Sequence, residues 1–308
     1  MASLKSQIIN FLVCNRHLFQ GRLKPEIWDM NTSIPAFRRQ AEKSNARIAN
    51  QLPEGVEVST FQLGGMKAEW LTPHGANHDK VILYAIGGGY ISGSCNDSRQ
   101  IVAKIAKVSG IPILIFEHRN APEDPYPAAL EDALQAYQWL LAQGNDPQNI
   151  VLMGASAGGG LVLASLLALR DQNIPLPVAA VAISPWTDLK LTGESHRKNE
   201  KLCISPPGMS RVCSKHYVGD HDPEDPYISP LYGDLHGLPP LLIIAGSYEI
   251  MLDDSTRFAE KARQAGVNVT LRVGDKMMHC YPLMTPFFPE ATQALEEIAG
   301  FIRFHLRI

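Results

Sequence analysis

Short apolar runs alternate with longer amphipathic stretches along the chain from residue 81 onward. The runs are rich in Val, Ile and Leu, which is typical of strands buried on both faces of a sheet; they cover residues 81–86, 111–116, 150–153, 178–183, 241–245 and 267–273. Between them, apolar positions recur at helical spacing over residues 98–108, 128–142, 158–171, 255–265 and 289–306. This order predicts an α/β fold with a mostly parallel sheet flanked by helices.

Two segments depart from this rhythm. Residues 1 to about 50 have a helical pattern with no strand, and residues 189–232 form a long stretch rich in Pro, Asp, His and Ser. Loops of this length in a compact domain usually carry function, commonly as lids. The first segment has apolar side chains at helical spacing, namely Ile8, Phe11, Leu12, Leu18 and Phe19. We expect from this spacing an amphipathic helix whose apolar side packs on the body of the protein.

The composition is that of a folded globular chain, with 308 residues of which 45% are hydrophobic and 19% charged. Lys and Arg number 28 against 31 Asp and Glu, a formal charge of −3 that argues against a nucleic-acid partner. The five cysteines form no Cys-x-x-Cys pair, so we expect neither a disulfide framework nor a zinc ribbon, and a cytoplasmic location. The N-terminal apolar patch is too short for a signal peptide, and no run reaches the about 18 apolar residues of a membrane span.

The strongest local motif is Gly-Ala-Ser-Ala-Gly at residues 154–158. It follows a predicted strand and opens a predicted helix, the setting of a nucleophile elbow in which the serine projects from a sharp turn. Small residues around Ser156 permit this strained backbone. The alternative is a glycine-rich turn whose serine only caps the helix. We interpret Ser156 as the candidate nucleophile.

A serine nucleophile needs a base and an acid that orients the base, in the chain order Ser, acid, His for this type of fold. His279 follows the strand at 267–273 and is the candidate base. The remaining histidines after Ser156 are interpreted as surface residues, most of them solvated: His196, His216, His221, His236 and His305.

The acid is expected after the strand at 241–245. Glu249 lies closest to the strand end, whereas Asp253 and Asp254 directly precede a predicted helix and could instead cap its amide groups. Glu249 is therefore the favoured acid, with the two aspartates left as alternatives.

An acyl-transfer site also needs fixed donors for the oxyanion of the tetrahedral intermediate. The glycines at 87–89 follow a predicted strand and offer unobstructed backbone amides, and Ala157 supplies the amide after the nucleophile. Neither a G-x-G-x-x-G nor a G-x-x-x-x-G-K-[ST] motif is present, so we expect no nucleotide cofactor. We expect no metal ion either.

These motifs together resemble the hormone-sensitive lipase-like branch of the α/β-hydrolase fold, the bacterial family IV esterases and lipases. The likeness runs from about residue 81 to the C-terminus and includes the motifs at 118–123, 154–159, 184–188, 229–231 and 249–254. It implies Ser156 as nucleophile, His279 as base and Glu249 as acid. The oxyanion donors that it implies are Gly88, Gly89 and Ala157.

The resemblance also implies a domain organisation and a substrate class. Residues 1–50 would form the N-terminal part of a helical cap on a catalytic domain spanning 51–308, with a cap insertion at about 189–225. The implied activity is hydrolysis of short- to medium-chain carboxylic esters through an acyl-enzyme, with a small ester as the partner and possible homodimer formation. The acyl preference and natural substrate are left open.

One departure from the family motif bears on activity. The family has His-Gly-Gly-Gly in the oxyanion loop, and Ile86 stands in place of that histidine. We expect weakened or altered activity from this change, because a polar side chain that helps to organise the loop is missing. The alternatives are a hydrolase-fold protein that binds a ligand without turnover, and a hydrolase of a related amide or lactone.

Overall fold

The computed structural model describes residues 2–19, 21, 23, 25–46 and 51–308. Its centre is an eight-stranded sheet in the order β1-β2-β4-β3-β5-β6-β7-β8, in which β1, β2 and β4 pair antiparallel and all other neighbours pair parallel. The strands are β1 (Val56–Leu63), β2 (Met66–Pro73), β3 (Val81–Ala85), β4 (Ile113–Phe116), β5 (Ile150–Ala155), β6 (Ala179–Ile183), β7 (Leu241–Gly246) and β8 (Val269–Gly274). The predicted α/β-hydrolase architecture is confirmed.

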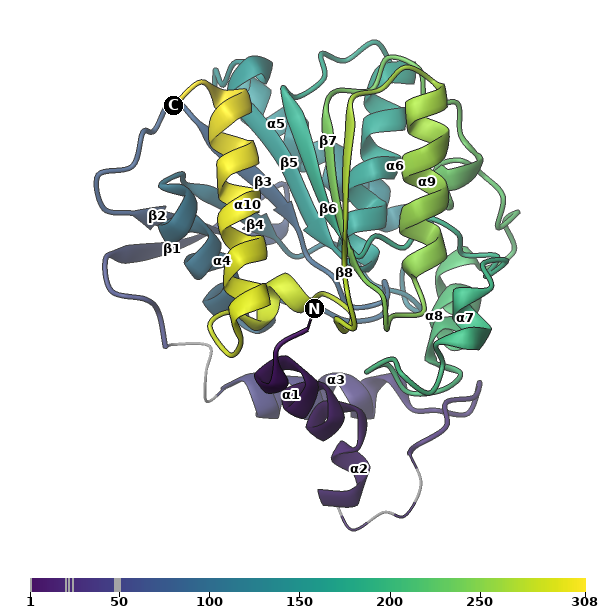
Figure 1. The fold of residues 1–308 in the computed structure, drawn as a ribbon. Helices are drawn as coiled ribbons and strands as arrows, with labels where there is room; N and C mark the ends of the chain where they lie inside the picture. Colours follow the sequence, from purple (N-terminus) through teal and green to yellow (C-terminus); the bar gives the residue numbers. More distant parts are fainter. Residues whose placement is uncertain (1, 20, 22, 24, 47–50) are drawn as a thin grey trace.

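Helices cover both faces of the sheet (Figure 1). On one face, α4 (Cys95–Ser109) and α10 (Pro289–Leu306) bury Ile105 and Ile298 against the strands. On the other face, α5 (Ala128–Ala142), α6 (Ala157–Asp171) and α9 (Leu252–Gln264) contribute Leu161 and Phe258 to a second apolar core. The sheet thus has an apolar core on each side, which accounts for the continuous Val, Ile and Leu runs in its parallel strands.

The hairpin of β1 and β2 has no counterpart in the predicted strands. Its strands have mixed burial because β1 lies at the sheet edge, and Lys67 and Glu69 interrupt the apolar positions of β2. Glu69 is fully buried and is held by the Arg99 guanidinium, whose Nε lies 2.7 Å from Glu69 Oε2. A buried charge with a partner from a distant helix cannot be recognised from local periodicity.

The N-terminal segment forms α1 (Leu4–Cys14), α2 (Arg16–Phe19) and α3 (Ile34–Ala46). The prediction that the apolar side of the first helix packs on the body is wrong. The apolar side chains that predicted this packing are all exposed, namely Ile8, Phe11, Leu12, Leu18 and Phe19. Instead α1 buries Ser6 and Asn10, because Glu290 and the Lys276 carbonyl offer polar partners at its contact with the body.

The segment between β6 and β7 contains α7 (Ser195–Lys198) and α8 (Met209–Val218). It lies against the N-terminal helices at one end of the molecule, below the sheet in Figure 1. The Trp28 amide donates to the Pro207 carbonyl at 2.8 Å, and the Arg16 guanidinium donates to the Ile204 carbonyl at 2.7 Å. Two segments far apart in the sequence therefore meet beyond the carboxyl ends of the parallel strands.

Candidate active site

Ser156 lies at a sharp turn between β5 and α6. Its backbone has φ +57° and ψ −124°, a strained conformation for a residue with a side chain. A Cβ on Gly154 would come within 2.3 Å of the Gly158 carbonyl oxygen, and one on Gly158 within 2.2 Å of the Ala85 oxygen. Only glycines therefore allow the turn to close, and the serine side chain is left at the tip.

The structure brings Ser156, His279 and Glu249 together from three different loops. His279 Nε2 lies 3.0 Å from Ser156 Oγ, and His279 Nδ1 lies 2.5 Å from Glu249 Oε2. The second carboxylate oxygen, Oε1, accepts a hydrogen bond from the Gly246 amide at 2.9 Å, at the end of β7. Glu249 is completely buried, so both of its oxygens have their partners inside the protein.

The two alternative acids have other contacts. Asp254 Oδ1 accepts from the Thr187 and Asp188 amides at 3.0 and 2.9 Å. Asp253 Oδ2 accepts from the Ser195 amide at 2.8 Å. Neither aspartate caps its own helix, because Asp254 bonds to the loop that follows β6 and Asp253 bonds to the first residue of α7.

The charge of His279 is set by its neighbours. Burial lowers the pKa of His279, but the Cys280 and Glu249 side chains outweigh this effect and raise the pKa well above its ordinary value. A buried imidazolium beside a buried carboxylate is favourable, because each ion compensates the loss of hydration of the other. The surroundings of the ring thus favour its protonated form.

The oxyanion loop lies beside this elbow. A Cβ on Gly87 would come within 2.5 Å of the Ala155 carbonyl oxygen, so the loop backbone approaches the turn closely. Gly88 and Gly89 have φ of +137° and +66°, and no acceptor for their N–H groups is found among the described residues. The amide of Ala157, the first residue of α6, has no partner within the helix either. These three amides thus have no hydrogen-bond acceptor among the described residues.

Ile86, at the position of the family histidine, is buried among apolar side chains of the sheet and α4. Its carbonyl oxygen lies 3.2 Å from His118 Nε2, and His118 Nδ1 lies 2.9 Å from the Arg119 carbonyl. A histidine from the loop after β4 thus contacts the backbone of the oxyanion loop. The motif at 118–123 identified this loop from sequence without indicating that contact.

Ser184 is a site-supporting residue that the sequence did not reveal. Its hydroxyl accepts a hydrogen bond at 3.0 Å from the amide of Cys280, the residue that follows His279. The backbone of Ser184 itself has φ +47°. It therefore ties the loop that carries the imidazole to the end of β6. The motif at 184–188 indicated the position but not its role.

Among the histidines expected on the surface, His196 differs. Its Nε2 lies 3.0 Å from Asp254 Oδ2, and its side chain is largely buried. Burial raises the pKa of Asp254, and the contact with His196 only partly opposes that shift. The pair joins α7 to α9 and does not reach Ser156, so it is a structural contact of the insertion.

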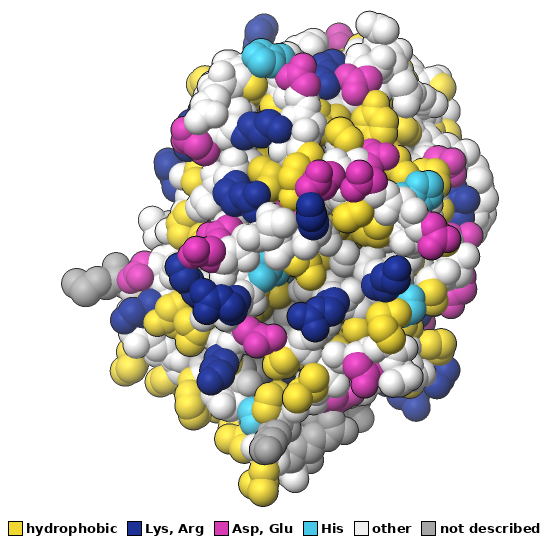
Figure 2. Space-filling view, turned by 90° about the vertical axis from the view of Figure 1, so that its right-hand side faces the viewer, with side chains coloured by type: hydrophobic (Ala, Val, Ile, Leu, Met, Phe, Trp, Pro, Cys, Tyr) yellow, Lys and Arg dark blue, Asp and Glu magenta, His cyan; other side chains and the backbone are white. Residues whose placement is uncertain are grey.

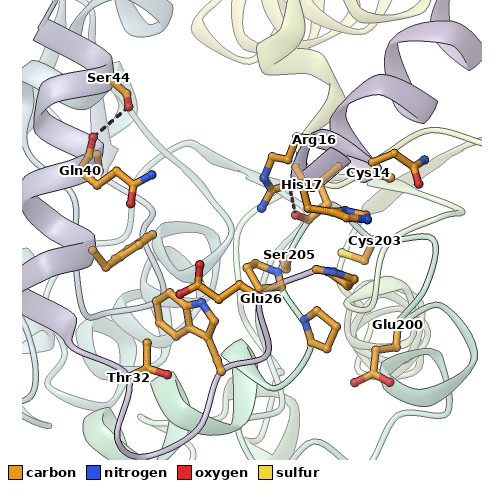
Figure 3. A pocket seen from close by; sticks show the side chains of 18 of the residues that line it. Cys14, Arg16, His17, Glu26, Thr32, Gln40, Ser44, Glu200, Cys203 and Ser205 are labelled. Atoms are coloured by element: carbon orange, nitrogen blue, oxygen red, sulfur yellow. Dashed lines mark hydrogen bonds between the residues drawn. The ribbon is translucent and has the colours of Figure 1, made fainter. Parts of the chain in front are cut away.

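A cavity of about 650 Å³ lies between the N-terminal helices and the insertion. Figure 3 shows Cys14, Arg16 and His17 on one side of it and Glu200, Cys203 and Ser205 on another. Ser156, Glu249 and His279 are not among the residues that line it. The cavity therefore belongs to the two irregular segments and is separate from the turn that carries Ser156.

A mostly parallel sheet with a serine at a tight strand-to-helix turn defines the alpha/beta hydrolase class. A family described as alpha/beta hydrolase fold matches residues 82–283. An acetyl-hydrolase of Streptomyces hygroscopicus is 38% identical over 98% of this chain and 97% of its own length. An esterase of Acinetobacter venetianus is 37% identical over 80% of this chain and 82% of its own.

Solved structures are similar over the whole chain. A crystal structure of EstE5 soaked with p-nitrophenyl butyrate has a TM-score of 0.91 and 36% identity, with full coverage of both chains. An esterase from the bacterial hormone-sensitive lipase family has a TM-score of 0.89 and 37% identity, with 99% of each chain covered. The chain belongs to the alpha/beta hydrolase family, in its hormone-sensitive lipase-like esterase branch. It is a carboxylic ester hydrolase.

Proposed function

We propose that the reaction proceeds through an acyl-enzyme on Ser156. His279 accepts the hydroxyl proton as Ser156 Oγ attacks the ester carbonyl, and Glu249 orients the ring and stabilises the imidazolium. The imidazolium then returns the proton to the leaving alcohol. Water attacks the acyl group with His279 again as base, which releases the carboxylic acid and frees Ser156. The position of the His279 ring, between the Ser156 hydroxyl and the Glu249 carboxylate, carries this proposal.

The negative oxygen of the tetrahedral intermediate would be bound by the amides of Gly88, Gly89 and Ala157. Their N–H groups lie on either side of the elbow, on the oxyanion loop and at the start of α6. Backbone donors are fixed before the reaction, so they stabilise the charge without reorganising. This role does not need the histidine that Ile86 replaces.

We propose short- to medium-chain esters as substrates, with residues 1–50 and about 189–225 forming a cap on a catalytic domain over 51–308. Relatives named acetyl-hydrolase and ethyl acetate hydrolase support short acyl groups. The contacts of Trp28 with Pro207 and of Arg16 with Ile204 support a single cap unit.

Turnover of p-nitrophenyl esters of increasing acyl length tests the proposal. The wild-type chain should hydrolyse the acetate and butyrate esters, and Ser156→Ala should lose about 10³-fold or more in kcat. Equal turnover by both would contradict the mechanism. The esterase relatives do not favour the alternative of a protein that binds a ligand without turnover. Parallel assays with amides and lactones decide between substrate classes.

A cytoplasmic location, the absence of a nucleic-acid partner and a homodimer remain expectations. All five cysteines are free, which suits a reducing compartment. None of the helices in the described part of the chain is both long and apolar enough to cross a bilayer. Light scattering on the purified chain at several concentrations measures the oligomeric state.

A further inference from the structure

The helix α1 is amphipathic, but its apolar side faces solvent and its polar side faces the body. Its apolar residues Leu4, Ile8, Phe11 and Leu12 have the spacing of one helical face, and all four are exposed. Phe11 is 62% exposed. A large apolar face open to water is unfavourable unless something else covers it.

The opposite side of α1 is polar, and it is the side that contacts the body. Ser6 and Asn10 are buried there. Ser3 Oγ, at the start of the helix, donates to Glu290 Oε2 at 2.9 Å, and Asn10 Nδ2 donates to the Lys276 carbonyl at 3.4 Å. Hydrogen bonds of this kind depend on orientation, so they fix which side of the helix is turned outward.

The exposed apolar surface continues into α2, where Leu18 and Phe19 are also exposed, the latter by 71%. We call the six residues of α1 and α2 the N-terminal apolar face: Leu4, Ile8, Phe11, Leu12, Leu18 and Phe19. Figure 2 shows hydrophobic side chains gathered toward the lower end of the molecule, the end at which Figure 1 places these helices. Large apolar side chains are thus concentrated at one end of the protein.

The N-terminal segment that carries this face, residues 1–25, differs in charge from the rest of the chain. The first 25 residues contain four Lys and Arg and no Asp or Glu, which leaves 24 basic and 31 acidic residues in the remainder. The segment is therefore positive, whereas residues 26–308 have a formal charge of −7. Lys5 and Arg16, within the helices, are exposed beside the apolar face.

We propose that the N-terminal apolar face binds an anionic lipid membrane. An apolar helix face flanked by basic residues inserts at the boundary of headgroups and acyl chains, and its cations attract anionic lipids. The negative remainder of the protein is repelled by the same surface, so the molecule is oriented with α1 and α2 toward the lipid.

Charge argues against a second copy of the chain as the occupant. A twofold contact through this face would bring two positive segments together, and like charges repel.

Arg16 also lines the cap cavity. Membrane binding would therefore bring that cavity close to the lipid surface, where apolar esters partition.

Flotation with lipid vesicles tests the proposal on the full chain. Vesicles of phosphatidylcholine with phosphatidylglycerol should bind the protein about tenfold more strongly than vesicles of phosphatidylcholine alone, and high salt should abolish the difference. Ser156→Ala should bind equally well, so binding is measured independently of the catalytic proposal. No binding to the anionic vesicles, or equal binding to both compositions, overturns the inference.

Matched variants locate the surface. Phe11→Ser and Phe19→Ser should each weaken vesicle binding several-fold, whereas Phe304→Ser should not, although Phe304 is 76% exposed at the opposite end on α10. Lys5→Glu should weaken binding to anionic vesicles, while the charge reversal Lys107→Glu on α4 should leave it unchanged. Circular dichroism verifies that each variant is folded.

Two results with these variants would reject the lipid surface as occupant. One is equal loss of binding in Phe11→Ser and Phe304→Ser. The other is a wild-type dimer that Phe11→Ser converts to a monomer in light scattering, because a second copy would then cover the face.

Discussion

Among single residues, Glu249 has a central place because it reaches His279 with one carboxylate oxygen and the Gly246 amide with the other. The spacing from the strand end favours Glu249 over Asp253 and Asp254 as the acid. In the structure Glu249 contacts His279, whereas the two aspartates accept hydrogen bonds from backbone amides elsewhere. A glutamate can take this position because its longer side chain spans from the end of β7 to the imidazole. We propose that Glu249 is the acid that orients His279.

The pH dependence of kcat/KM tests that role. His279 acts as a base only when neutral, so kcat/KM rises as pH rises through the pKa of His279. Because this pKa is raised, the rise occurs at higher pH than for an ordinary histidine. Glu249→Gln removes the negative charge, so the rise should move to lower pH while kcat falls about 10³-fold.

The control for that experiment is Glu260→Gln, an exposed residue of α9. It should keep both the wild-type kcat and the wild-type pH profile. An unchanged profile in Glu249→Gln would show that another group sets the charge of His279.

His118 contacts the oxyanion loop through the Ile86 carbonyl. His118→Phe should lower kcat about fivefold with little change in KM, because the lost hydrogen bond of about 1 kcal/mol supports a loop that acts in the transition state. His78→Phe, at an exposed position, is the matched control. A higher KM with unchanged kcat would place His118 in ground-state binding instead.

At the scale of elements, Arg38 connects α3 to two loops of the body through polar contacts, beside the apolar packing of Ile34. Arg38 donates to the Ile91 carbonyl at 2.6 Å and to the Ala121 carbonyl at 2.7 Å, and it pairs with Glu123 at 2.8 Å. Ile91 follows the oxyanion loop, and Ala121 belongs to the loop after β4. The N-terminal helices are therefore connected directly to the loops beside the catalytic turn.

Removal of this attachment should loosen the cap. Arg38→Ala leaves two carbonyls without a charged donor, so limited proteolysis within residues 1–50 should become faster and KM for p-nitrophenyl butyrate should rise several-fold. Arg39→Ala, at the exposed neighbouring position, should behave as wild type. Equal proteolysis of the two variants would argue against α3 being held by Arg38.

At the scale of the whole molecule, the sequence predicted the parallel sheet well because its strands β3 to β7 are buried along their whole length. The boundaries of α5 and α10 agree with the predicted ranges 128–142 and 289–306. The β1–β2 hairpin was not predicted because Glu69 is buried with a partner from α4, and periodicity does not reveal such tertiary contacts.

The orientation of α1 could not be predicted for a related reason. Its pattern indicated an amphipathic helix, but a pattern does not reveal which side faces the body. Glu290 and the Lys276 carbonyl, both far along the chain, decide that the polar side packs inward. Periodicity therefore predicts the local structure, while the docking of a helix depends on partners that only the fold brings together.

The proposed acyl-enzyme on Ser156 is tested most directly by intact mass after reaction with a fluorophosphonate. The wild-type chain should gain the mass of one phosphonyl group, peptide mapping should place it on Ser156, and Ser156→Ala should gain none. An adduct on a different residue, or an unmodified chain that still hydrolyses p-nitrophenyl acetate, would contradict the account.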